Sequence, residues 1–352
     1  MVLITGIPGF LGNRLAEVLV NGLEGYPDSW PYARTEEIRC LCLPAADASS
    51  ISRLSNRIEV ARGDVVDKKS MTEFFKDSEG ATLFHLAGVI HPDKKMGGGV
   101  KQFYRVNVDG TKNVLDLAKE HRVKKVIVIS SDSQSGFNPN KEHRFTEDSP
   151  YNPYMNYGRS KMLMEQIVNG YVNLDDMDIT IIRTCWLYGP NQPERHTEFF
   201  TMIKEGKVPM IGDGTNLCSM SYVDNTCSGM LLASINSATK GKTYWIADER
   251  PYSMNEIIDT IADVLENDFG FKVNHRRIRL PNLVGSIAYL IDSMLQGMGF
   301  YNKKIHVLSE MNKNSACSIE LARKEIGYNP VLSLREGMNK SIKWCINNNH
   351  RI

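Results

Sequence analysis

The segment that joins the first apolar strand of this chain to its first helix most constrains the fold. Residues 2–5 are predicted to form a strand, and residues 10–21 have the apolar spacing of a helix. Between them, Thr-Gly-Ile-Pro-Gly-Phe-Leu-Gly has glycines that permit a tight turn and a close approach of backbone to a pyrophosphate. The free N–H groups at the helix start attract an anion. We therefore predict a dinucleotide-binding loop. Its cofactor-binding residues are Gly6, Gly9, Phe10, Leu11 and Gly12.

The first half of the chain repeats this alternation of short apolar strands and longer helical patterns. Further strands are predicted at residues 38–43, 58–62, 82–86, 125–130 and 179–183, and long helices at 103–121 and 157–171. This order is typical of an α/β fold, in which a doubly wound parallel sheet has helices on both faces. Residues 24–37 form a longer polar connection to which we assign no role.

Composition excludes several classes of protein. The 352 residues include 42 Lys and Arg against 41 Asp and Glu, so the net charge of +1 lacks the basic signature of a nucleic-acid binder. Seven cysteines without a CxxC pair indicate reduced thiols, and no Cys and His cluster has the spacing of metal ligands. We therefore expect no bound metal. No secretory signal is recognisable, so we expect a cytoplasmic protein.

The most apolar stretch is residues 280–301, which Asp292 and Gln296 interrupt, so no membrane span is predicted. Its apolar residues recur at helical spacing. They are Leu283, Val284, Ile287, Leu290, Ile291 and Leu295. We expect this helix to turn its apolar face to the core; the alternative is a helix that lies on a membrane surface.

Two further strand ends agree with a dinucleotide site. Asp64 and Val65 follow the third strand, where a carboxylate can accept a hydrogen bond from an adenine amine. The fourth strand ends in small residues, over which a dinucleotide can pass. They are Leu86, Ala87 and Gly88. After the second strand, Asp47 favours NAD, whereas Ser49 and Ser50 suit the extra phosphate of NADP; we predict NAD and keep NADP as the alternative.

The predicted chemistry rests on Tyr157 and Lys161, which lie four residues apart on one face of a helix. A nearby ammonium favours the phenolate, which can take a proton from a substrate hydroxyl as hydride leaves the same carbon. Ser131, at the end of the fifth strand, can hydrogen-bond the reacting oxygen. Asn107 lies in the helix between the fourth and fifth strands.

Together these motifs resemble the extended short-chain dehydrogenases/reductases of the NAD-dependent epimerase/dehydratase kind. The resemblance spans nearly the whole chain. It rests on residues 5–12, 63–64, 85–88, 107–111, 130–136, 157–161, 183–190, 212–214, 222–224 and 322–330.

The resemblance implies roles for these residues. Tyr157 would be the catalytic acid/base, and Lys161 would adjust the pKa of Tyr157 and hold the nicotinamide ribose. Ser131 would be the hydroxyl partner, and Asn107 would have a supporting role on the cofactor side.

The resemblance also implies a Rossmann domain with a smaller, mostly C-terminal α/β substrate domain, and a homodimer formed through residues 103–121 and 157–171. The expected boundaries are 1–182 with about 220–250 for the first domain, and 183–219 with 251–352 for the second.

The chain departs from the family pattern at the substrate side. Asp132 is present, but Ser133 stands where 4,6-dehydratases have a glutamate, which argues against full dehydration. Trp186 and Cys218 occupy positions at which nucleotide-sugar epimerases hold a diphosphate. A cation for the diphosphate could come instead from Arg195 or Lys204. The candidate substrate-binding residues are therefore Asp132, Ser133, Trp186, Arg195 and Cys218.

Three functions follow in order of preference. The first is C4 epimerisation or keto reduction of a nucleotide-activated hexose by an NAD(P)-dependent enzyme of polysaccharide biosynthesis. The second is oxidation of an apolar hydroxy compound, because Tyr-Val-Asp-Asn at residues 222–225 and the helix after Pro281 also resemble 3β-hydroxysteroid dehydrogenases. The third is a non-catalytic dinucleotide sensor.

Overall fold

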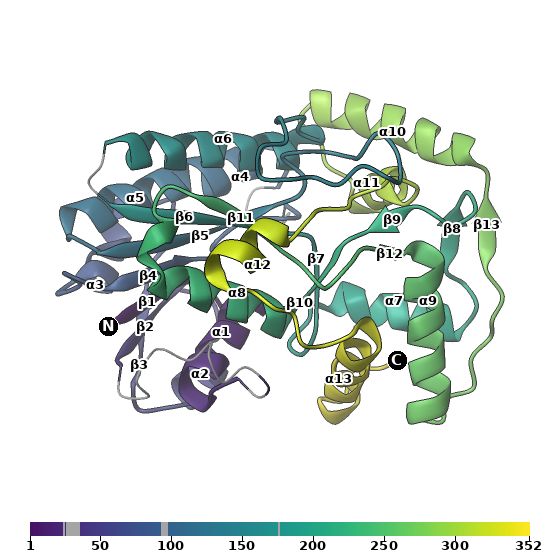
Figure 1. Ribbon diagram of the computed structural model, residues 1–352, viewed down its shortest axis with the longest axis horizontal. Coiled ribbons are helices and arrows are strands. Elements are labelled where there is room, and N and C mark those ends of the chain that lie inside the picture. The colour runs from purple at the N-terminus through teal and green to yellow at the C-terminus, as the bar shows by residue number, and fades with distance from the viewer. Residues whose placement is uncertain (24, 26–35, 93–97, 175–176) are drawn as a thin grey trace.

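A computed structural model describes residues 1–23, 25, 36–92, 98–174 and 177–352. Its centre is a seven-stranded, all-parallel sheet of order β11-β6-β5-β4-β1-β2-β3 (Figure 1). The connection at residues 24–37 lies largely outside the described residues. The predicted doubly wound α/β fold is confirmed by this strand order, because the chain runs outward from β1 in both directions.

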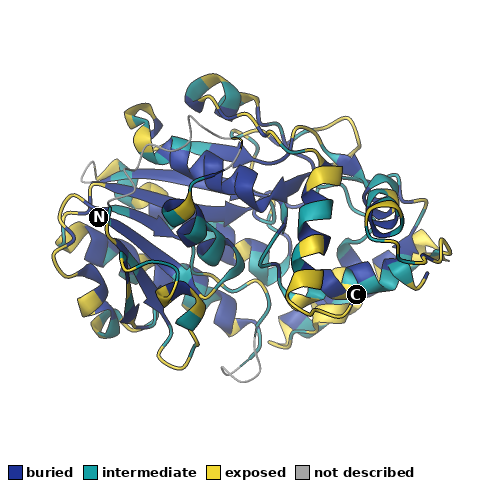
Figure 2. Ribbon diagram, turned by 90° about the horizontal axis from the view of Figure 1, so that it is seen from below, coloured by how far each residue is buried: buried dark blue, intermediate teal, exposed yellow. Residues whose placement is uncertain are grey.

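Six strands of this sheet fall close to their predicted positions, and the seventh, the edge strand β11, was not predicted. They are β1 (Val2–Ile7), β2 (Ile38–Cys42), β3 (Ile58–Arg62), β4 (Thr82–His85), β5 (Lys125–Ser131), β6 (Asp178–Thr184) and β11 (Thr243–Ile246). All residues of β5 are buried, as expected for a central parallel strand covered on both sides. Figure 2 shows the strands of the central sheet largely in the colour of buried residues.

Helices cover both faces of the sheet. One face packs against α1 (Phe10–Asn21), α8 (Val223–Ile235) and α12 (Glu320–Ile326). The other packs against α3 (Thr72–Phe75), α5 (Thr111–Glu120) and α6 (Met155–Asn173). The short α2 (Ser49–Ser52) follows β2. Each face therefore has its own apolar core.

The predicted helix at residues 103–121 is a continuous helical segment with a wider turn near its start. It consists of α4 (Lys101–Phe103), a π-helical stretch over Tyr104–Gly110 and α5. Stretches of π-helix are rare and are frequent at functional sites. Asn107, one of the predicted site residues, lies within this one.

The second half of the chain adds a smaller, mixed assembly beside the carboxyl ends of the sheet strands (Figure 1). Its helices are α7 (Glu194–Lys204), α9 (Met254–Asp263), α10 (Asn282–Gly297), α11 (Lys303–Glu310) and α13 (Leu334–Asn347). Three two-stranded ladders complete it. They are formed by β7 (Trp186–Tyr188) with β10 (Met220–Tyr222), β9 (Leu217–Cys218) with β12 (Tyr252–Ser253), and β8 (Pro209–Ile211) with β13 (Ile278–Leu280).

The prediction that the apolar face of residues 280–301 packs on the core is wrong. In α10 the buried residues are Gly285, Ala288, Asp292 and Gln296, whereas Leu290 is 60% exposed. The inner face is polar because it hydrogen-bonds to neighbouring helices, so the apolar face is left outward. No helix among the described residues has the length and apolarity needed to cross a bilayer.

Candidate active site

The glycine loop has the tight turn that its sequence predicts. Gly6 has a φ of 91°, and its carbonyl accepts a 2.8 Å hydrogen bond from the N–H of Gly9. A Cβ on Gly9 or Gly12 would lie 2.5 or 2.6 Å from the Gly6 oxygen. The loop therefore leaves room only for hydrogen at these positions, which brings bare backbone to the start of α1, where a pyrophosphate would lie.

Gly6→Ala is expected to destabilise the chain by about 2 kcal/mol or more and to remove bound NAD. The added Cβ would lie 2.8 Å from the backbone nitrogen of Ala87 and the carbonyl carbon of Leu86, in a left-handed conformation that already costs about 1–2 kcal/mol. Gly80→Ala is the matched control, because Gly80 has a φ of 75° with no atom within 4 Å of the added Cβ. Equal losses in urea unfolding for both variants would contradict the packing argument.

Buried hydrogen bonds tie the ends of β1 and β4 together beneath the loop. His85 contacts the hydroxyls of Thr5 at 2.8 Å and Thr111 at 2.9 Å. The same Thr5 hydroxyl accepts from the N–H groups of Leu86 and Ala87. Burial lowers the pKa of His85 to about 3, so the ring is neutral and serves as a structural link.

The predicted adenine end is formed by the turn after β3. The Asp64 carboxylate accepts from the N–H of Val66 at 3.1 Å, which holds the turn. Val65 packs against Gly110, where a Cβ would lie 2.7 Å from its Cγ2. Asp47, which the sequence predicts to recognise the ribose of NAD, lies five residues after β2; it is exposed and accepts from the N–H of Ser49 at 2.8 Å.

Asn107 joins the strand-end loop to α6. Its Oδ1 accepts from the N–H of Val89 at 2.7 Å, and its Nδ2 donates to the Val89 carbonyl at 3.0 Å and to the Ser160 hydroxyl at 2.9 Å. Asn107 thus positions the loop that holds Gly88 and the helix that holds Lys161. Lys161 Nζ lies 3.6 Å from where a Cβ on Gly88 would be.

Lys161 is buried and donates to the carbonyl of Ile129 at 3.1 Å. Burial lowers its pKa to about 8, and the carboxylate of Glu165, one turn later in α6, opposes that shift. The ammonium is therefore still present at neutral pH. It stands between Gly88 and the end of β5, where a nicotinamide ribose would lie.

The predicted catalytic tyrosine lies beside Ser131 and Asp132. Burial raises the pKa of Tyr157 to about 12, and the Ser131 hydroxyl, by hydrogen bonding, lowers it. Ser131 Oγ donates to Asp132 Oδ1 at 3.0 Å, and the Ser133 hydroxyl lies 3.3 Å from Ser131 Oγ. The hydroxyl of Ser315 donates to the other oxygen of Asp132. Three of the predicted site residues are thus in one hydrogen-bonded group next to the phenol.

Arg195 brings positive charge to this group. The charge of Arg195 lowers the pKa of Tyr157 and of Tyr301. Burial lowers the pKa of Arg195 itself. No carboxylate among the described residues forms an ion pair with it. The charge of this half-buried cation is not neutralised by a carboxylate, so it suits an anionic substrate group.

The structure adds a carboxylate that sequence reasoning missed. Glu310 lies at the end of α11, and His306 Nε2 is 3.4 Å from its Oε1. Burial raises the pKa of Glu310 to about 7; His306 opposes that shift, and Asp132 and Asp292 add to it. Its charge in turn raises the pKa of Tyr157. No motif or spacing marks Glu310, because it reaches the site only through the packing of α11.

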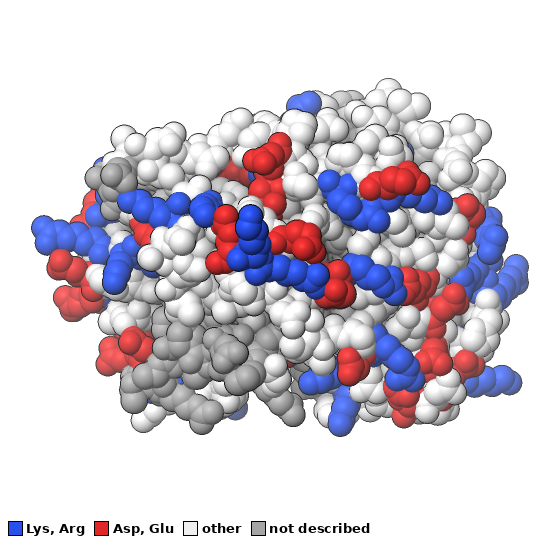
Figure 3. All heavy atoms as spheres, viewed as in Figure 1, with Lys and Arg blue, Asp and Glu red and all other residues white. Residues whose placement is uncertain are grey.

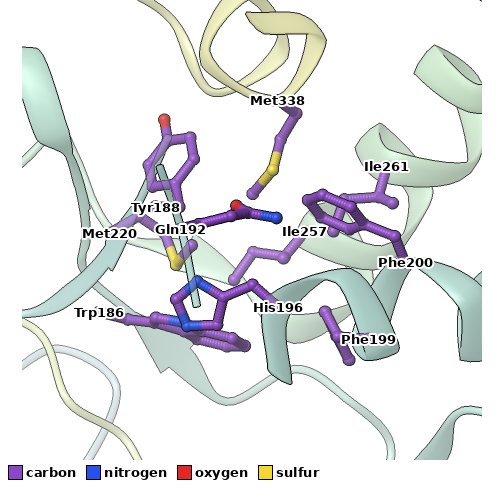
Figure 4. A pocket seen from close by; sticks show the side chains of 10 residues that line it. All are labelled: Trp186, Tyr188, Gln192, His196, Phe199, Phe200, Met220, Ile257, Ile261 and Met338. Atoms are coloured by element: carbon purple, nitrogen blue, oxygen red, sulfur yellow. The ribbon is translucent and has the colours of Figure 1, made fainter. Parts of the chain in front are cut away.

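Trp186 and Cys218 belong to different surroundings. Trp186 donates from its indole nitrogen to His196 at 3.2 Å, and both line a small, mostly apolar cavity (Figure 4). His196 also contacts the ring of Phe10 in the glycine loop at 6.3 Å between centroids. The half-buried Cys218 lies near Asp132, whose charge helps burial to raise the thiol pKa to about 12, so Cys218 is a neutral wall of the site.

This fold and site define an NAD-binding member of the extended short-chain dehydrogenases/reductases. The model of the "NAD dependent epimerase/dehydratase family" matches residues 2–247, so the chain belongs to that family. The resemblance inferred from the motifs is thereby confirmed, and NAD is the cofactor. The cradle of bare backbone at Gly6, Gly9 and Gly12 fits such a group.

The proteins to which this chain is similar have names that state different functions. "Uncharacterized protein y4nL" of Sinorhizobium fredii is 46% identical over 350 residues, which cover 99% of this chain and 96% of the relative. The Arabidopsis thaliana "3beta-hydroxysteroid-dehydrogenase/decarboxylase isoform 1" is 27% identical over 82% of this chain and 67% of its own length. A crystal structure of DesIV (dTDP-glucose 4,6-dehydratase) from Streptomyces venezuelae with NAD bound matches with a TM-score of 0.76 and 23% identity, over 99% of this chain and 97% of that one.

Proposed function

We propose that this chain uses NAD to oxidise and reduce C4 of a nucleotide-activated hexose, in a C4 epimerisation or a keto reduction. The observation that carries the proposal is Arg195, a half-buried cation beside Tyr157 that has no carboxylate partner among the described residues. A diphosphate is the anion that a hexose substrate of this family would carry. DesIV, which has the same fold, is a dTDP-glucose 4,6-dehydratase by its name.

In this proposal NAD is held by the glycine loop, by Asp64 and Val65, by residues 86–88 and by Asn107 and Lys161. Bound NAD supplies the hydride acceptor and donor. Tyr157, as phenolate, takes the proton of the C4 hydroxyl, and Ser131 hydrogen-bonds the same oxygen. Lys161 stabilises the phenolate by charge and would hold the ribose. The proton returns from Tyr157 when the keto group is reduced.

The substrate side is proposed to be built by residues 183–219 and 251–352, with residues 1–182 and about 220–250 holding the cofactor. Asp132, Ser133 and Cys218 would line the hexose, and Trp186 the neighbouring apolar wall. We also propose a homodimer formed through α4, α5 and α6, which the mass of the purified chain in sedimentation equilibrium would test.

Identifying the nucleotide released from denatured, freshly purified protein tests the cofactor role. Near-stoichiometric NAD(H) is expected if the cofactor is recycled within one turnover, as epimerisation requires. The loaded protein is then incubated with UDP-, dTDP- and GDP-hexoses, and products are separated by chromatography. A C4 epimer, or NADH formed at 340 nm as the C4 hydroxyl is oxidised in the reverse of keto reduction, supports the proposal. A 4-keto-6-deoxy product would instead assign dehydration, and conversion of none of them would contradict it.

A second candidate is oxidation of an apolar hydroxy compound. The observation that favours it is the apolar character of the side chains around Trp186, among them Phe199 and Met220, which His196 connects to Phe10 at the start of α1. The Arabidopsis relative is named as a hydroxysteroid dehydrogenase. Oxidation of a 3β-hydroxysteroid with NAD, without conversion of any nucleotide hexose, would select this candidate.

Opposite shifts in the pH profile are expected for Arg195→Gln and Glu310→Gln. The Arg195 cation lowers the pKa of Tyr157, so its loss should move the rise of kcat to higher pH. The Glu310 carboxylate raises the pKa of Tyr157, so its loss should move that rise to lower pH. Glu79→Gln, at an exposed position distant in the fold, is the control. Shifts in the same direction for both variants would refute this assignment of charges.

A further inference from the structure

The outer face of α10 is the most unusual surface of the chain. Seven apolar residues at or just beyond this helix are 43–69% exposed. They are Leu283, Ile287, Leu290, Ile291, Met294, Met298 and Phe300. A soluble monomer rarely exposes so many apolar side chains together, and such patches mark interaction sites. We call these seven residues the α10 apolar face.

Polar contacts on the inner side hold the helix in this orientation. Asp292 Oδ2 lies 2.7 Å from His306 Nδ1, and Gln296 Nε2 donates to the same carboxylate oxygen at 2.9 Å. Gln296 Oε1 accepts from the side chain of Asn156 in α6 at 3.0 Å. A rotation of α10 that buried its apolar face would expose or unpair these groups, so the outward face is built into the packing.

The exposed charges just before and just after α10 are basic. Residues 269–309 contain six Lys and Arg and a single acidic residue, Asp292, which is fully buried, although the whole chain is balanced. The exposed Arg276 and Arg279 precede α10, and the exposed Lys303 and Lys304 follow it. None of these four has a carboxylate partner among the described residues. Along α10 the rim of the molecule is nearly free of charged side chains (Figures 1 and 3).

We propose that α10 lies on the surface of an anionic phospholipid bilayer, with its apolar face inserted among the acyl chains and the flanking cations at the headgroups. An apolar helix face bordered by basic residues is the pattern of interfacial helices. At about 24 Å for 16 residues, α10 has the length to lie flat in the interface. A second copy fits less well, because a symmetric contact would bring the basic ends of one α10 against those of the other.

The site has a direct connection to this surface. The inner face of α10 holds α11, and α11 carries His306 and Glu310 to the substrate side. A chain docked in this way would hold its substrate side on the inner face of α10, one helix away from the membrane. The docking itself is independent of which substrate is used, so it is tested by binding alone.

The experiment measures flotation of the full chain, loaded with NAD, with vesicles of phosphatidylcholine alone or mixed with phosphatidylglycerol. We expect binding at least about tenfold tighter to the mixed vesicles, weakening as salt is raised. The variant L283S/L290S/M294S should lose about tenfold or more of that binding. The variant R276Q/R279Q/K304Q should lose the preference for phosphatidylglycerol; Lys303 is left in place because its charge also acts on His91 and His196 near Arg195. Retained NAD and an unchanged Tm show that each variant is folded.

The matched control is L174S/I235S/V331S, which removes exposed apolar side chains elsewhere and should bind as the unmodified chain does. The proposal fails if the unmodified chain does not float with mixed vesicles, or if L283S/L290S/M294S floats equally well. It also fails if the unmodified chain ignores vesicles and forms a dimer in sedimentation equilibrium that L283S/L290S/M294S dissociates, since the face would then bind a second copy.

Discussion

Tyr157→Phe is expected to lower kcat by roughly 10²–10⁴-fold, the usual contribution of a positioned acid/base. The phenylalanine ring keeps the contact with Phe103, whose ring centroid is 5.8 Å away, so the site should remain packed. The substitution removes only the hydroxyl, which faces Ser131 and would exchange a proton with the substrate. The measurement is single-turnover conversion of the nucleotide hexose identified in the substrate screen.

NAD content distinguishes lost chemistry from a lost cofactor. We expect Tyr157→Phe to retain NAD as the unmodified chain does, because Tyr157 is on the substrate side of Lys161. Tyr104→Phe is the matched control: its hydroxyl donates to Asn156 at 2.6 Å on the same side of the molecule, outside the group formed by Ser131 and Asp132. Full activity of Tyr157→Phe would remove the enzyme assignment and favour a sensor.

Much of the cofactor side could be predicted because local sequence determines it. The glycine loop needs its glycines for contacts within a few residues, and α1 begins at Phe10 as its apolar spacing predicts. Asn107 could be placed in a helix, but its bonds to Val89 and Ser160 depend on a π-helical stretch that no propensity reveals. Local patterns thus indicate which residues approach the cofactor, and less well how they are held.

The substrate side could be predicted only in part because long-range packing builds it. Glu310 lies 153 positions after Tyr157 and reaches it through the pairing of α10 with α11. The helical spacing of residues 280–301 shows that α10 has an apolar face but not which way it turns. Gly285 lies so close to Asn312 that a Cβ would be 3.0 Å from its Oδ1, and this contact favours the small, polar side as the inner one.

Glu165→Ala is expected to lower the free energy of unfolding by roughly 3–5 kcal/mol, because it leaves a buried cation without its partner. Glu165 is fully buried in α6 and Arg183 is 4% exposed in β6; their bonds are 2.7 and 3.1 Å long. Tyr151 donates to the same carboxylate at 2.9 Å. Urea unfolding measures the loss.

Two controls separate the buried pair from charge in general. Glu79→Ala breaks the exposed pair with Arg122, whose side chains are 72% and 78% exposed, and should cost no more than about 1 kcal/mol. The double variant E165L/R183M removes both charges and should be more stable than Glu165→Ala, since no unpaired charge remains. A double variant less stable than the single one would show that Arg183 has other essential contacts, such as its position over Trp245 at 5.5 Å.

In the proposed mechanism the same carboxylate would link stability to catalysis. Glu165 opposes the fall in the pKa of Lys161, which burial lowers to about 8. Without Glu165 that pKa should fall further, so Lys161 would lose its charge at a lower pH and the phenolate of Tyr157 its support. We therefore expect kcat of a destabilised but folded Glu165→Gln variant to decline on the alkaline side at lower pH than that of the unmodified chain. An unchanged alkaline limb would show that Glu165 acts on stability alone.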